Sequence, residues 1–397
     1  MTAWRPQLYE RHGHDAGVDP IVLDHALDTA EQLRAISPDL PPVFTLAHLS
    51  HQSGVSYVSL RNIVERSHDE PYRVFRIRKR AAHPNEHRYR HIAVPSTALM
   101  KTQRWITQAI LSKVRPHPSS VAFSKGDTLV TAAAPHCGCR WLIKMDVRNF
   151  FESINEIAVF RVFLSLGYQP LISFEMARIC TRLAGWSIRR STDRWDVHSW
   201  SSEGHRWSEI KAYQAYRPDI GPLLGHLPQG APTSPMLANL AMRDFDDGAS
   251  KIARKHGLIY TRYADDLTFS ASDYDFTDTQ CRRVIGQVYR LMGKVGLSPN
   301  VTKTRVAPPG SRKIVLGLLV DGERPRLTRE FRALMRQHLY YIQRPDIGPV
   351  QHAKTRGFVS VAGFRNHLYG LVAFARQIDL AYGEACMRAL NKVSWPV

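Results

Sequence analysis

Two adjacent carboxylates in the run Tyr263-Ala264-Asp265-Asp266 are the side chains of this sequence best suited to chemistry. Strand-forming residues precede the pair at Ile259-Tyr260-Thr261 and follow it at Leu267-Thr268-Phe269, which predicts a hairpin with both acids at its tip. Neighbouring negative charges repel each other unless a cation lies between them. Because Mg²⁺ prefers one or two carboxylates together with substrate phosphates, the pair predicts two-metal phosphoryl transfer. The alternative is a pair that only shapes the turn.

A third acid, Asp146, ends the apolar stretch Trp141-Leu142-Ile143-Lys144-Met145. This stretch predicts a strand, and the run from Arg148 to Ile154 predicts the start of a helix after it. A carboxylate near the end of a buried strand costs free energy unless it is paired or bound to metal. Asp146 is therefore a second candidate metal ligand, distant in sequence from the hairpin.

The chain between these acids supplies a rigid turn. Three prolines and one glycine between Leu227 and Pro235 restrict the backbone before a helix predicted from Met236 to Ile252. The preceding residues, 181–226, contain Trp186, Trp195, Trp200 and Trp207 among polar residues with little periodicity, which predicts an inserted subdomain or a long loop. These tryptophans suit either stacking on bases or anchoring of a small structured insertion.

The charge of the 397 residues points to a polyanionic partner. Lysine and arginine number 54 against 35 aspartates and glutamates, a formal net charge of +19. Nucleic acid is the favoured partner. An anionic membrane surface is the alternative, but the cations are spread along the sequence and not concentrated on one amphipathic helix. The sequence shows neither a long apolar run nor an apolar signal core at its start, so we expect a cytoplasmic protein that does not engage a membrane.

The five cysteines are odd in number and mostly scattered, which is typical of reduced thiols in a cytosolic fold. The run His136-Cys137-Gly138-Cys139 resembles half of a zinc site. No second Cys/His pair at ligand spacing follows it, so we do not expect structural zinc.

Three further segments suit contact with nucleic acid. The apolar pattern from Phe44 to Arg66, broken at Ser53-Gly54, predicts two helices joined by a tight turn. A helix-turn-helix DNA-binding regulator is therefore the non-enzymatic alternative. Residues 71–105 are basic and predict strands that carry cations, with a solvated charged face as the other interpretation. From Leu327 to Ile342 the pattern predicts a helix with Arg329, Arg332 and Arg336 along one edge, where they could follow a phosphate backbone.

In this order, Asp146, the turn Pro228-Gln229-Gly230 and the pair Asp265-Asp266 resemble the palm of reverse transcriptases. The resemblance covers most of residues 44–390 except the insertion. It implies an α+β right-hand polymerase fold with an antiparallel-sheet palm, and RNA-templated DNA synthesis with two Mg²⁺ ions. The implied regions are an N-terminal helical lead-in (1–43), fingers (44–137), a palm in two parts (138–180 and 227–320), the Trp-rich insertion (181–226) and a helical thumb (321–397).

The resemblance also implies residue roles. Asp146 and Asp265 match the ligands of both metals, and Asp266 matches a less direct contributor. Lys303 matches a lysine proposed to protonate pyrophosphate, although an ordinary surface lysine is the competing interpretation. The hairpin from Lys313 to Val320 matches the primer grip. Five residues are implied to contact the incoming dNTP. Arg90 matches the fingers cation that holds the phosphates, the backbone of Asn149 and Phe150 lies beside them, and Gln229 contacts the nucleotide. Phe151 matches the sugar gate that excludes a 2′-hydroxyl.

Within reverse transcriptases, the runs Gly257 to Ser270 and Leu227 to Pro235 look most like the bacterial retron type. That type copies part of a partner noncoding RNA into single-stranded DNA, and the same RNA primes the synthesis. The result is an RNA–DNA product. The resemblance also implies a role in antiphage defence, for which an effector protein is a candidate partner. Two motifs depart from its pattern, because Ala132 replaces an asparagine and Leu316 replaces a threonine. Both segments are associated with the cognate RNA. The alternative is therefore a related defence-associated reverse transcriptase that makes unbranched or repetitive DNA. Under either assignment, the helix-turn-helix segment is scaffold or an RNA contact.

Overall fold

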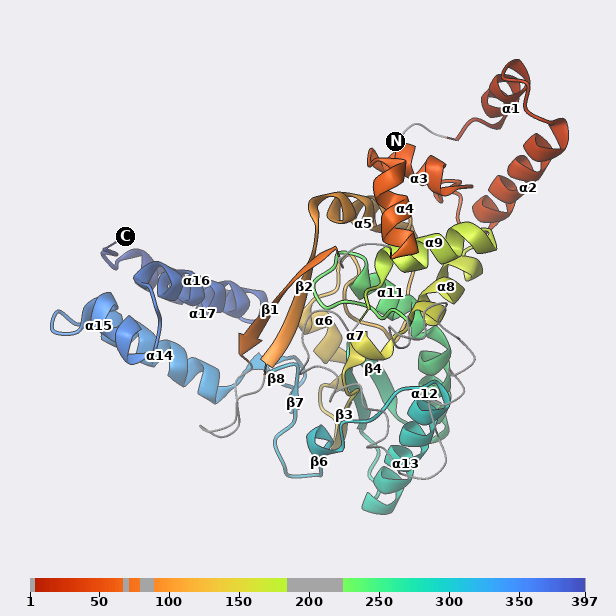
Figure 1. Cartoon of the computed structure of the whole chain (residues 1–397). Helices are drawn as coiled ribbons and strands as arrows, with labels where there is room; N and C mark the ends of the chain where they lie inside the picture. Colours follow the sequence, from red (N-terminus) through yellow and green to blue (C-terminus); the bar gives the residue numbers. More distant parts are fainter. Residues whose placement is uncertain (1–3, 67–70, 79–88, 184–223, 397) are drawn as a thin grey trace, which may run out of the picture.

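The computed structural model describes residues 4–66, 71–78, 89–183 and 224–396, which form a mixed α+β structure with antiparallel sheets. The largest sheet has four strands in the order β4-β5-β3-β6 and lies at the centre of the molecule (Figure 1). Its strands are β3 (Trp141–Asp146), β4 (Ile259–Tyr263), β5 (Asp266–Ala271) and β6 (Arg305–Ala307). The predicted hairpin is thus confirmed as β4 and β5, and the predicted strand before Asp146 as β3.

One face of the central sheet is apolar and covered by helices. Because side chains alternate along a strand, the register places Ile143, Met145, Leu267 and Phe269 on this face, and all four are buried. The helices α12 (Arg243–Lys255) and α13 (Asp278–Lys294) pack together beside it (Figure 1). The opposite face carries Asp146 and Asp266 at the same end of the sheet.

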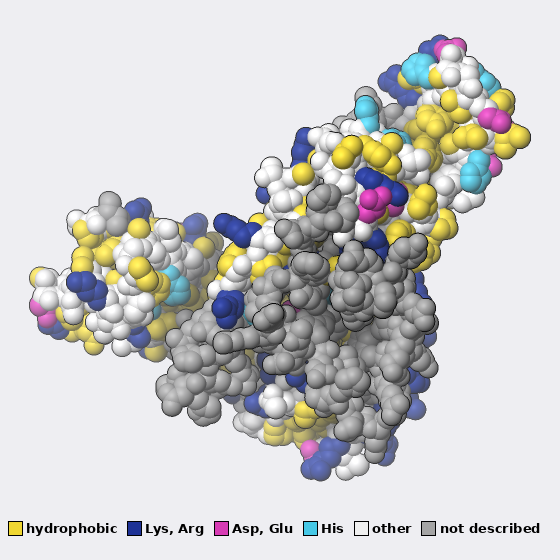
Figure 2. Space-filling view, in the orientation of Figure 1, with side chains coloured by type: hydrophobic (Ala, Val, Ile, Leu, Met, Phe, Trp, Pro, Cys, Tyr) yellow, Lys and Arg dark blue, Asp and Glu magenta, His cyan; other side chains and the backbone are white. Residues whose placement is uncertain are grey.

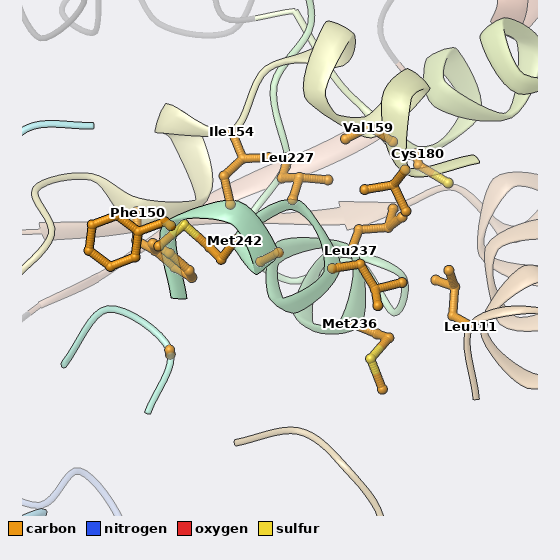
Figure 3. Packing of buried hydrophobic residues seen from close by; sticks show 14 of the residues in the cluster. Leu111, Phe150, Ile154, Val159, Cys180, Leu227, Met236, Leu237 and Met242 are labelled. Atoms are coloured by element: carbon orange, nitrogen blue, oxygen red, sulfur yellow. The ribbon is translucent and has the colours of Figure 1, made fainter. Parts of the chain in front are cut away.

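The predicted helix from Met236 to Ile252 is two helices, α11 (Ser234–Ala241) and α12, that meet at Met242. Side chains of α11 point in several directions into the core, toward Cys180 and Leu111 among others (Figure 3). In contrast, α12 has one buried stripe, formed by Phe245, Ala249 and Ala253. A change of direction at Met242 lets the first helix enter the core while the second lies on the sheet.

The residues before the central sheet form helices and a basic hairpin. The predicted pair of helices is confirmed as α3 (Leu46–Ser53) and α4 (Tyr57–Glu65), joined at Gly54, whose φ of 62° suits glycine. The strands predicted in the basic segment 71–105 are confirmed as β1 (Tyr72–Arg78) and β2 (Tyr89–Pro95), which pair antiparallel. The prediction is wrong after Pro95, because residues 97–105 belong to a helix whose Leu99 and Ile106 are buried at helical spacing. The other elements of this part are α1 (Pro6–Asp15), α2 (Pro20–Ile36), α5 (Thr97–Ala109), the 3₁₀ turns η1 (Leu111–Lys113) and η2 (Ala134–His136), α6 (Leu129–Ala133), α7 (Phe150–Ser153), α8 (Glu156–Ser165) and α9 (Pro170–Cys180).

The C-terminal helices form a lobe beside the main body, at the other end of the molecule from α1 and α2 (Figure 1). Their core is separate from that of the body and includes Met335, Phe364, Leu368 and Val372. A small three-stranded sheet precedes them in the chain. The elements are β7 (Ile314–Val315), β8 (Leu318–Leu319), β9 (Arg326–Leu327), α14 (Arg329–Gln343), α15 (Gly348–Thr355), α16 (Val361–Ile378) and α17 (Leu380–Asn391).

The two ends of the predicted insertion meet at the body. Arg182 and His226 exchange both backbone hydrogen bonds, each 2.9 Å long. The chain therefore leaves and re-enters the body at one place. Trp186, Trp195, Trp200 and Trp207 lie outside the described residues, so their predicted roles stay predictions. In the described part of the chain, no helix combines the length and the apolar character that crossing a membrane requires.

Candidate active site

The three predicted metal ligands lie at one end of the central sheet, Asp146 and Asp266 on paired strands and Asp265 in the turn before β5. Asp146, the last residue of β3, is directly opposite Asp266, the first residue of β5. The backbone N–H of Val147 donates to the carbonyl of Asp265 at 3.0 Å, which fixes the turn against the end of β3. Ala264 turns the chain with a φ of 55°, an uncommon conformation for a residue other than glycine. Two segments more than a hundred residues apart in sequence are thus joined at one end of the sheet.

The acids at this end of the sheet are buried close to one another. Burial, and after it the charges of Asp146 and Asp266, raise the pKa of Asp265 to about 6. Burial also raises the pKa of Asp266, while Lys144 acts in the opposite direction. Like charges directly opposite each other on paired strands are destabilising. A cation at this position would relieve both the repulsion and the cost of burial.

Asp146 is held by a segment that docks beside β3. The side-chain amide of Asn300 donates to Oδ1 of Asp146 at 2.9 Å, and Nζ of Lys303 donates to Oδ2 at 2.6 Å. The backbone N–H of Asn300 also donates to the carbonyl of Asp146 at 2.8 Å. Lys303 ends the 3₁₀ turn η6 (Val301–Lys303) and is about half exposed. The structure thus brings Lys303 to an acid, and it adds Asn300, which sequence reasoning missed although it lies three residues earlier.

The donor chemistry of this centre fits a divalent cation. Carboxylate oxygens are the ligands that Mg²⁺ prefers, and burial together with the charges of Asp146 and Asp266 raises the pKa of Asp265, so a cation there would be favourable. Among the residues that the structure describes, no three Asp, Glu, His or Cys side chains converge closely enough to form a metal-binding group. Instead, the Lys303 ammonium neutralises Asp146, so binding of a metal would compete with this ion pair.

The Pro-Gln-Gly turn attaches to β2. The backbone N–H of Ala93 donates to the carbonyl of Gln229 at 2.8 Å. Gly230 has a φ of 117°, and a Cβ there would lie 2.9 Å from Cγ2 of Ile92 and 3.0 Å from the carbonyl oxygen of Ala93. Only glycine permits so close an approach of the two backbones. Gln229 is thereby tied to the strand that carries Arg90, whose side chain is exposed.

The residues that follow Asp146 reverse the chain sharply. Asn149 adopts a left-handed conformation with a φ of 48°, which asparagine tolerates better than most residues, and it precedes α7. Phe150 is buried in the main core (Figure 3), and Phe151 is half-buried beside it with 5.5 Å between ring centroids. The ring predicted to act as a sugar gate, Phe151, is therefore partly exposed five residues beyond Asp146, while Phe150 anchors the turn.

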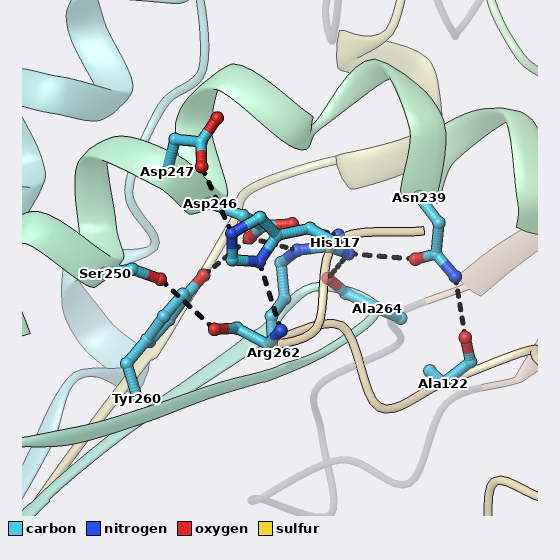
Figure 4. A network of polar contacts seen from close by, with 10 residues as sticks. His117, Ala122, Asn239, Asp246, Asp247, Ser250, Tyr260, Arg262 and Ala264 are labelled. Atoms are coloured by element: carbon cyan, nitrogen blue, oxygen red, sulfur yellow. Dashed lines mark hydrogen bonds and ion pairs between the residues drawn. The ribbon is translucent and has the colours of Figure 1, made fainter. Parts of the chain in front are cut away.

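A buried ion pair supports the turn that carries Asp265 (Figure 4). Arg262, on β4, is fully buried and donates to both carboxylate oxygens of Asp246 at 2.8 and 2.6 Å. Tyr260 donates to the same carboxylate at 2.8 Å. The remaining nitrogen of Arg262, Nη1, donates to Oδ1 of Asn239 at 3.1 Å and to the carbonyl of Ala264 at 3.3 Å. Sequence reasoning missed this network. In the sequence, the network is indicated only by Arg262, a cation within the predicted strand before Asp265.

Residues 214–320 match the protein family described as reverse transcriptase (RNA-dependent DNA polymerase). Retron Ec86 reverse transcriptase of Escherichia coli is 29% identical over 357 residues, which are 89% of this chain and 94% of that protein. Retron Mx65 reverse transcriptase of Myxococcus xanthus is 30% identical over 299 residues, 75% of this chain and 60% of that protein. Retron Ec83 reverse transcriptase of Escherichia coli is 24% identical over 324 residues, 81% of this chain and 90% of that protein.

The chain belongs to the retron-type reverse transcriptases. The predicted resemblance is confirmed, and the chain is an RNA-directed DNA polymerase. The helices of the predicted helix-turn-helix are then part of a reverse transcriptase. Leu60 and Val64 of α4 are buried, and Arg61 pairs with Glu65 at 2.6 Å and with Glu175 of α9 at 3.5 Å, so this helix packs on the body of the enzyme.

In this reverse transcriptase, His136 of the considered zinc half-site is engaged with the central sheet. Its Nδ1 lies 2.7 Å from the hydroxyl of Ser270, and its Nε2 lies 2.7 Å from the hydroxyl of Thr261. Burial lowers the pKa of His136 to about 4, so the ring is neutral at physiological pH. Burial also raises the pKa of the Cys139 thiol to about 11. His136 therefore joins β4 and β5 as a neutral hydrogen-bonding side chain.

The three arginines predicted along one edge of a C-terminal helix differ in their surroundings. Arg329 and Arg336 of α14 are exposed. Arg332 pairs with Asp379 at 2.5 Å, and its guanidinium lies 4.4 Å from the ring centroid of Tyr382. Arg332 thus joins α14 to the start of α17, and Arg329 and Arg336 are the better candidates for contact with a phosphate backbone.

Proposed function

We propose that this reverse transcriptase copies part of a partner noncoding RNA into single-stranded DNA and acts in antiphage defence. The observation that supports the polymerase chemistry is the position of Asp146, Asp265 and Asp266 at one end of the central sheet. Its relatives are named as retron reverse transcriptases, which supports the same assignment. An RNA that serves as template and primer, dNTPs and an RNA–DNA product are the partners that follow, and an effector protein is a further candidate.

The proposed domain assignment follows the order of the chain. The central sheet with its covering helices is the palm, in two parts (138–180 and 227–320). The hairpin β1–β2 and the helices near it are the fingers (44–137), and α14–α17 are the thumb (321–397). Residues 1–43 are a helical lead-in and residues 181–226 an insertion. Under this assignment, Gln229 joins palm to fingers through its hydrogen bond to Ala93.

Asp146, Asp265 and Asp266 are the residues that would hold two Mg²⁺ ions. When bound, these ions would acidify the primer hydroxyl and offset the charge of the triphosphate. Asn300 keeps Asp146 oriented by its amide hydrogen bond. Lys303, which donates to the same acid at 2.6 Å, would donate a proton to departing pyrophosphate.

The other proposed roles concern the nucleotide. Arg90 contacts its phosphates, and the backbone of Asn149 and Phe150 lies beside them. Gln229 contacts the nucleotide from the palm side. Phe151 lies beneath the sugar and excludes a 2′-hydroxyl, so the enzyme prefers dNTPs to rNTPs. Replacement of Phe151 by alanine should therefore raise rNTP incorporation, and unchanged sugar selectivity would remove Phe151 from this role.

Primer extension tests the site. The purified full chain should extend a DNA primer on an RNA template with Mg²⁺, and Asp265→Ala should abolish extension because one carboxylate of the metal centre is lost. Asp275→Ala is the matched control, since Asp275 is exposed on the loop after the far end of β5. Extension that survives Asp265→Ala at the native rate would contradict the assignment of the site.

Sequencing of the nucleic acid that co-purifies with the chain tests the product. Single-stranded DNA joined to a structured RNA supports the retron assignment. Unbranched or repetitive DNA supports the second candidate, a related defence-associated reverse transcriptase. Two departures from the retron pattern favour keeping that candidate, Ala132 in α6 and Leu316 in the turn between β7 and β8.

A further inference from the structure

Phe123 combines two unfavourable features. Its φ is 68°, in the left-handed region where a bulky side chain is strained, and its side chain is 42% exposed. Glycine or asparagine would remove the strain, and a polar residue would suit the exposure. Neither backbone preference nor burial therefore explains an aromatic ring at this position.

The backbone around Phe123 is fixed independently of its ring. The N–H of Val121 donates to the carbonyl of Arg262 at 2.9 Å, which joins this loop to β4. The side-chain amide of Asn239 donates to the carbonyl of Ala122 at 2.6 Å (Figure 4). On the other side, the N–H of Ser124 donates to a carboxylate oxygen of Asp127 at 2.8 Å. These bonds hold the strained conformation, so the loop does not depend on the Phe123 ring.

The ring of Phe123 lies against the proposed nucleotide pocket. Its centroid is 6.5 Å from that of Phe151 and 6.2 Å from that of Tyr263. Both distances lie within the range at which aromatic rings attract each other. Tyr263 directly precedes the turn that carries Asp265, and Phe151 is the proposed sugar gate. Phe123 thus contacts the gate and the residue before the metal-binding turn.

We propose that Phe123 is a specificity-determining residue, which limits the movement of the Phe151 ring and so sets the width of the slot for the sugar of the incoming nucleotide. The inference rests on the proposed role of Phe151. Without the Phe123 ring, Phe151 can move aside, and a nucleotide with a 2′-hydroxyl enters more easily.

Phe123→Gly in the full chain separates this role from a structural one. Glycine adopts the local φ without strain, so the thermal midpoint should equal or exceed that of the native protein. The ratio of kcat/KM for a dNTP to kcat/KM for the matching rNTP, measured on an RNA template, should fall about three- to tenfold. Phe123→Leu, which keeps a side chain but not the ring, should lower the ratio in the same direction. Tyr274→Ala is the control, because it removes an exposed ring beyond the opposite end of β5 and should leave the ratio unchanged.

A double variant tests whether Phe123 acts through Phe151. Phe123→Gly combined with Phe151→Ala should lower the ratio no further than Phe151→Ala alone, because two residues that act through one contact are not additive. Additive effects, or an unchanged ratio in folded Phe123→Gly, would overturn the inference while leaving the gate in place. An unchanged ratio in Phe151→Ala would overturn the proposed gate and this inference with it.

Discussion

At the scale of single residues, the ionised carboxylate of Asp265 lowers the stability of the folded chain. Its pKa is about 6 in the folded chain and 3.8 in a free side chain. Between these values the folded protein binds the proton more tightly than the unfolded chain, so stability falls as pH rises through this interval. Such an arrangement is typical of a site selected for function.

Asp265→Asn should therefore inactivate the enzyme and stabilise it. Above pH 6 the gain in the free energy of unfolding should be about 3 kcal/mol in the absence of Mg²⁺. The gain should shrink as pH falls below 6, because the native carboxyl then becomes protonated. Thermal unfolding at several pH values measures the gain, with the exposed Asp275→Asn as the control. Added Mg²⁺ should stabilise only the native protein. Equal stability of native and variant chains at neutral pH would contradict the assigned electrostatics.

Lys303 has two possible functions, which charge-preserving substitution separates. Lys303→Arg keeps a cation beside Asp146 but cannot release a proton near neutral pH, whereas Lys303→Met removes both properties. If Lys303 is the proton donor, both variants should lower kcat, by on the order of a hundredfold, while primer binding stays unchanged. Single-turnover extension measures the rate, and anisotropy of a labelled primer–template measures binding. Recovery of the native rate in Lys303→Arg would assign the lysine to charge neutralisation instead.

At the scale of elements, the turn between β4 and β5 depends on a helix behind the sheet. Asp246 of α12 neutralises the buried Arg262, which in turn donates to the carbonyl of Ala264. Asp246→Ala would leave a buried, unpaired guanidinium and should lower the free energy of unfolding by about 3–5 kcal/mol. Chemical denaturation measures this loss. Asp278→Ala, which breaks the exposed pair with Arg282, is the control and should cost less than about 1 kcal/mol.

The double variant Asp246→Leu and Arg262→Met asks whether the pair also positions the turn. Replacement of both partners by apolar residues should restore most of the stability, because no buried charge remains. The turn would still lack the hydrogen bond from the Arg262 guanidinium to the carbonyl of Ala264. The double variant should therefore have a lower kcat than the native enzyme, while its KM for dNTP changes little. Full activity of the double variant would show that the ion pair only stabilises the fold.

Local patterns predicted the strands of this site better than its supports. The alternation on both sides of Asp265-Asp266 predicted the hairpin, because a turn with two flanking strands is encoded in adjacent residues. Arg262 has the appearance of an ordinary cation in a strand, and Asp246 belongs to an acidic run at the start of a helix. Their pairing depends on the packing of α12 against β4, which no local pattern reports. The break at Met242 was missed for a similar reason, since it follows from the direction in which each helix meets the core.

At the scale of the whole molecule, the excess of 19 positive charges is distributed over separate parts. In the face shown in Figure 2, lysine and arginine side chains are visible on the C-terminal lobe and at several places on the main body. The three arginines of α14 differ in their availability to nucleic acid. Arg332 pairs with Asp379 at the start of α17, whereas Arg329 and Arg336 are exposed. A polymerase that moves along its template benefits from cations that contact phosphates without reading bases.

Arg336→Ala should therefore weaken binding of an RNA template–primer equally for different sequences. The slope of the logarithm of the binding constant against the logarithm of the salt concentration is negative. Loss of one phosphate contact should reduce its magnitude by about 0.9, because one fewer counterion is released on binding. Anisotropy titrations at several salt concentrations measure the slope. Arg282→Ala is the matched control, since this arginine is exposed on α13, which covers the apolar side of the central sheet, and its loss should leave the slope unchanged. An unaltered slope in Arg336→Ala would remove Arg336 from the path of the nucleic acid.

Arg332→Ala should instead lower the thermal midpoint, because it releases α14 from Asp379 and Tyr382.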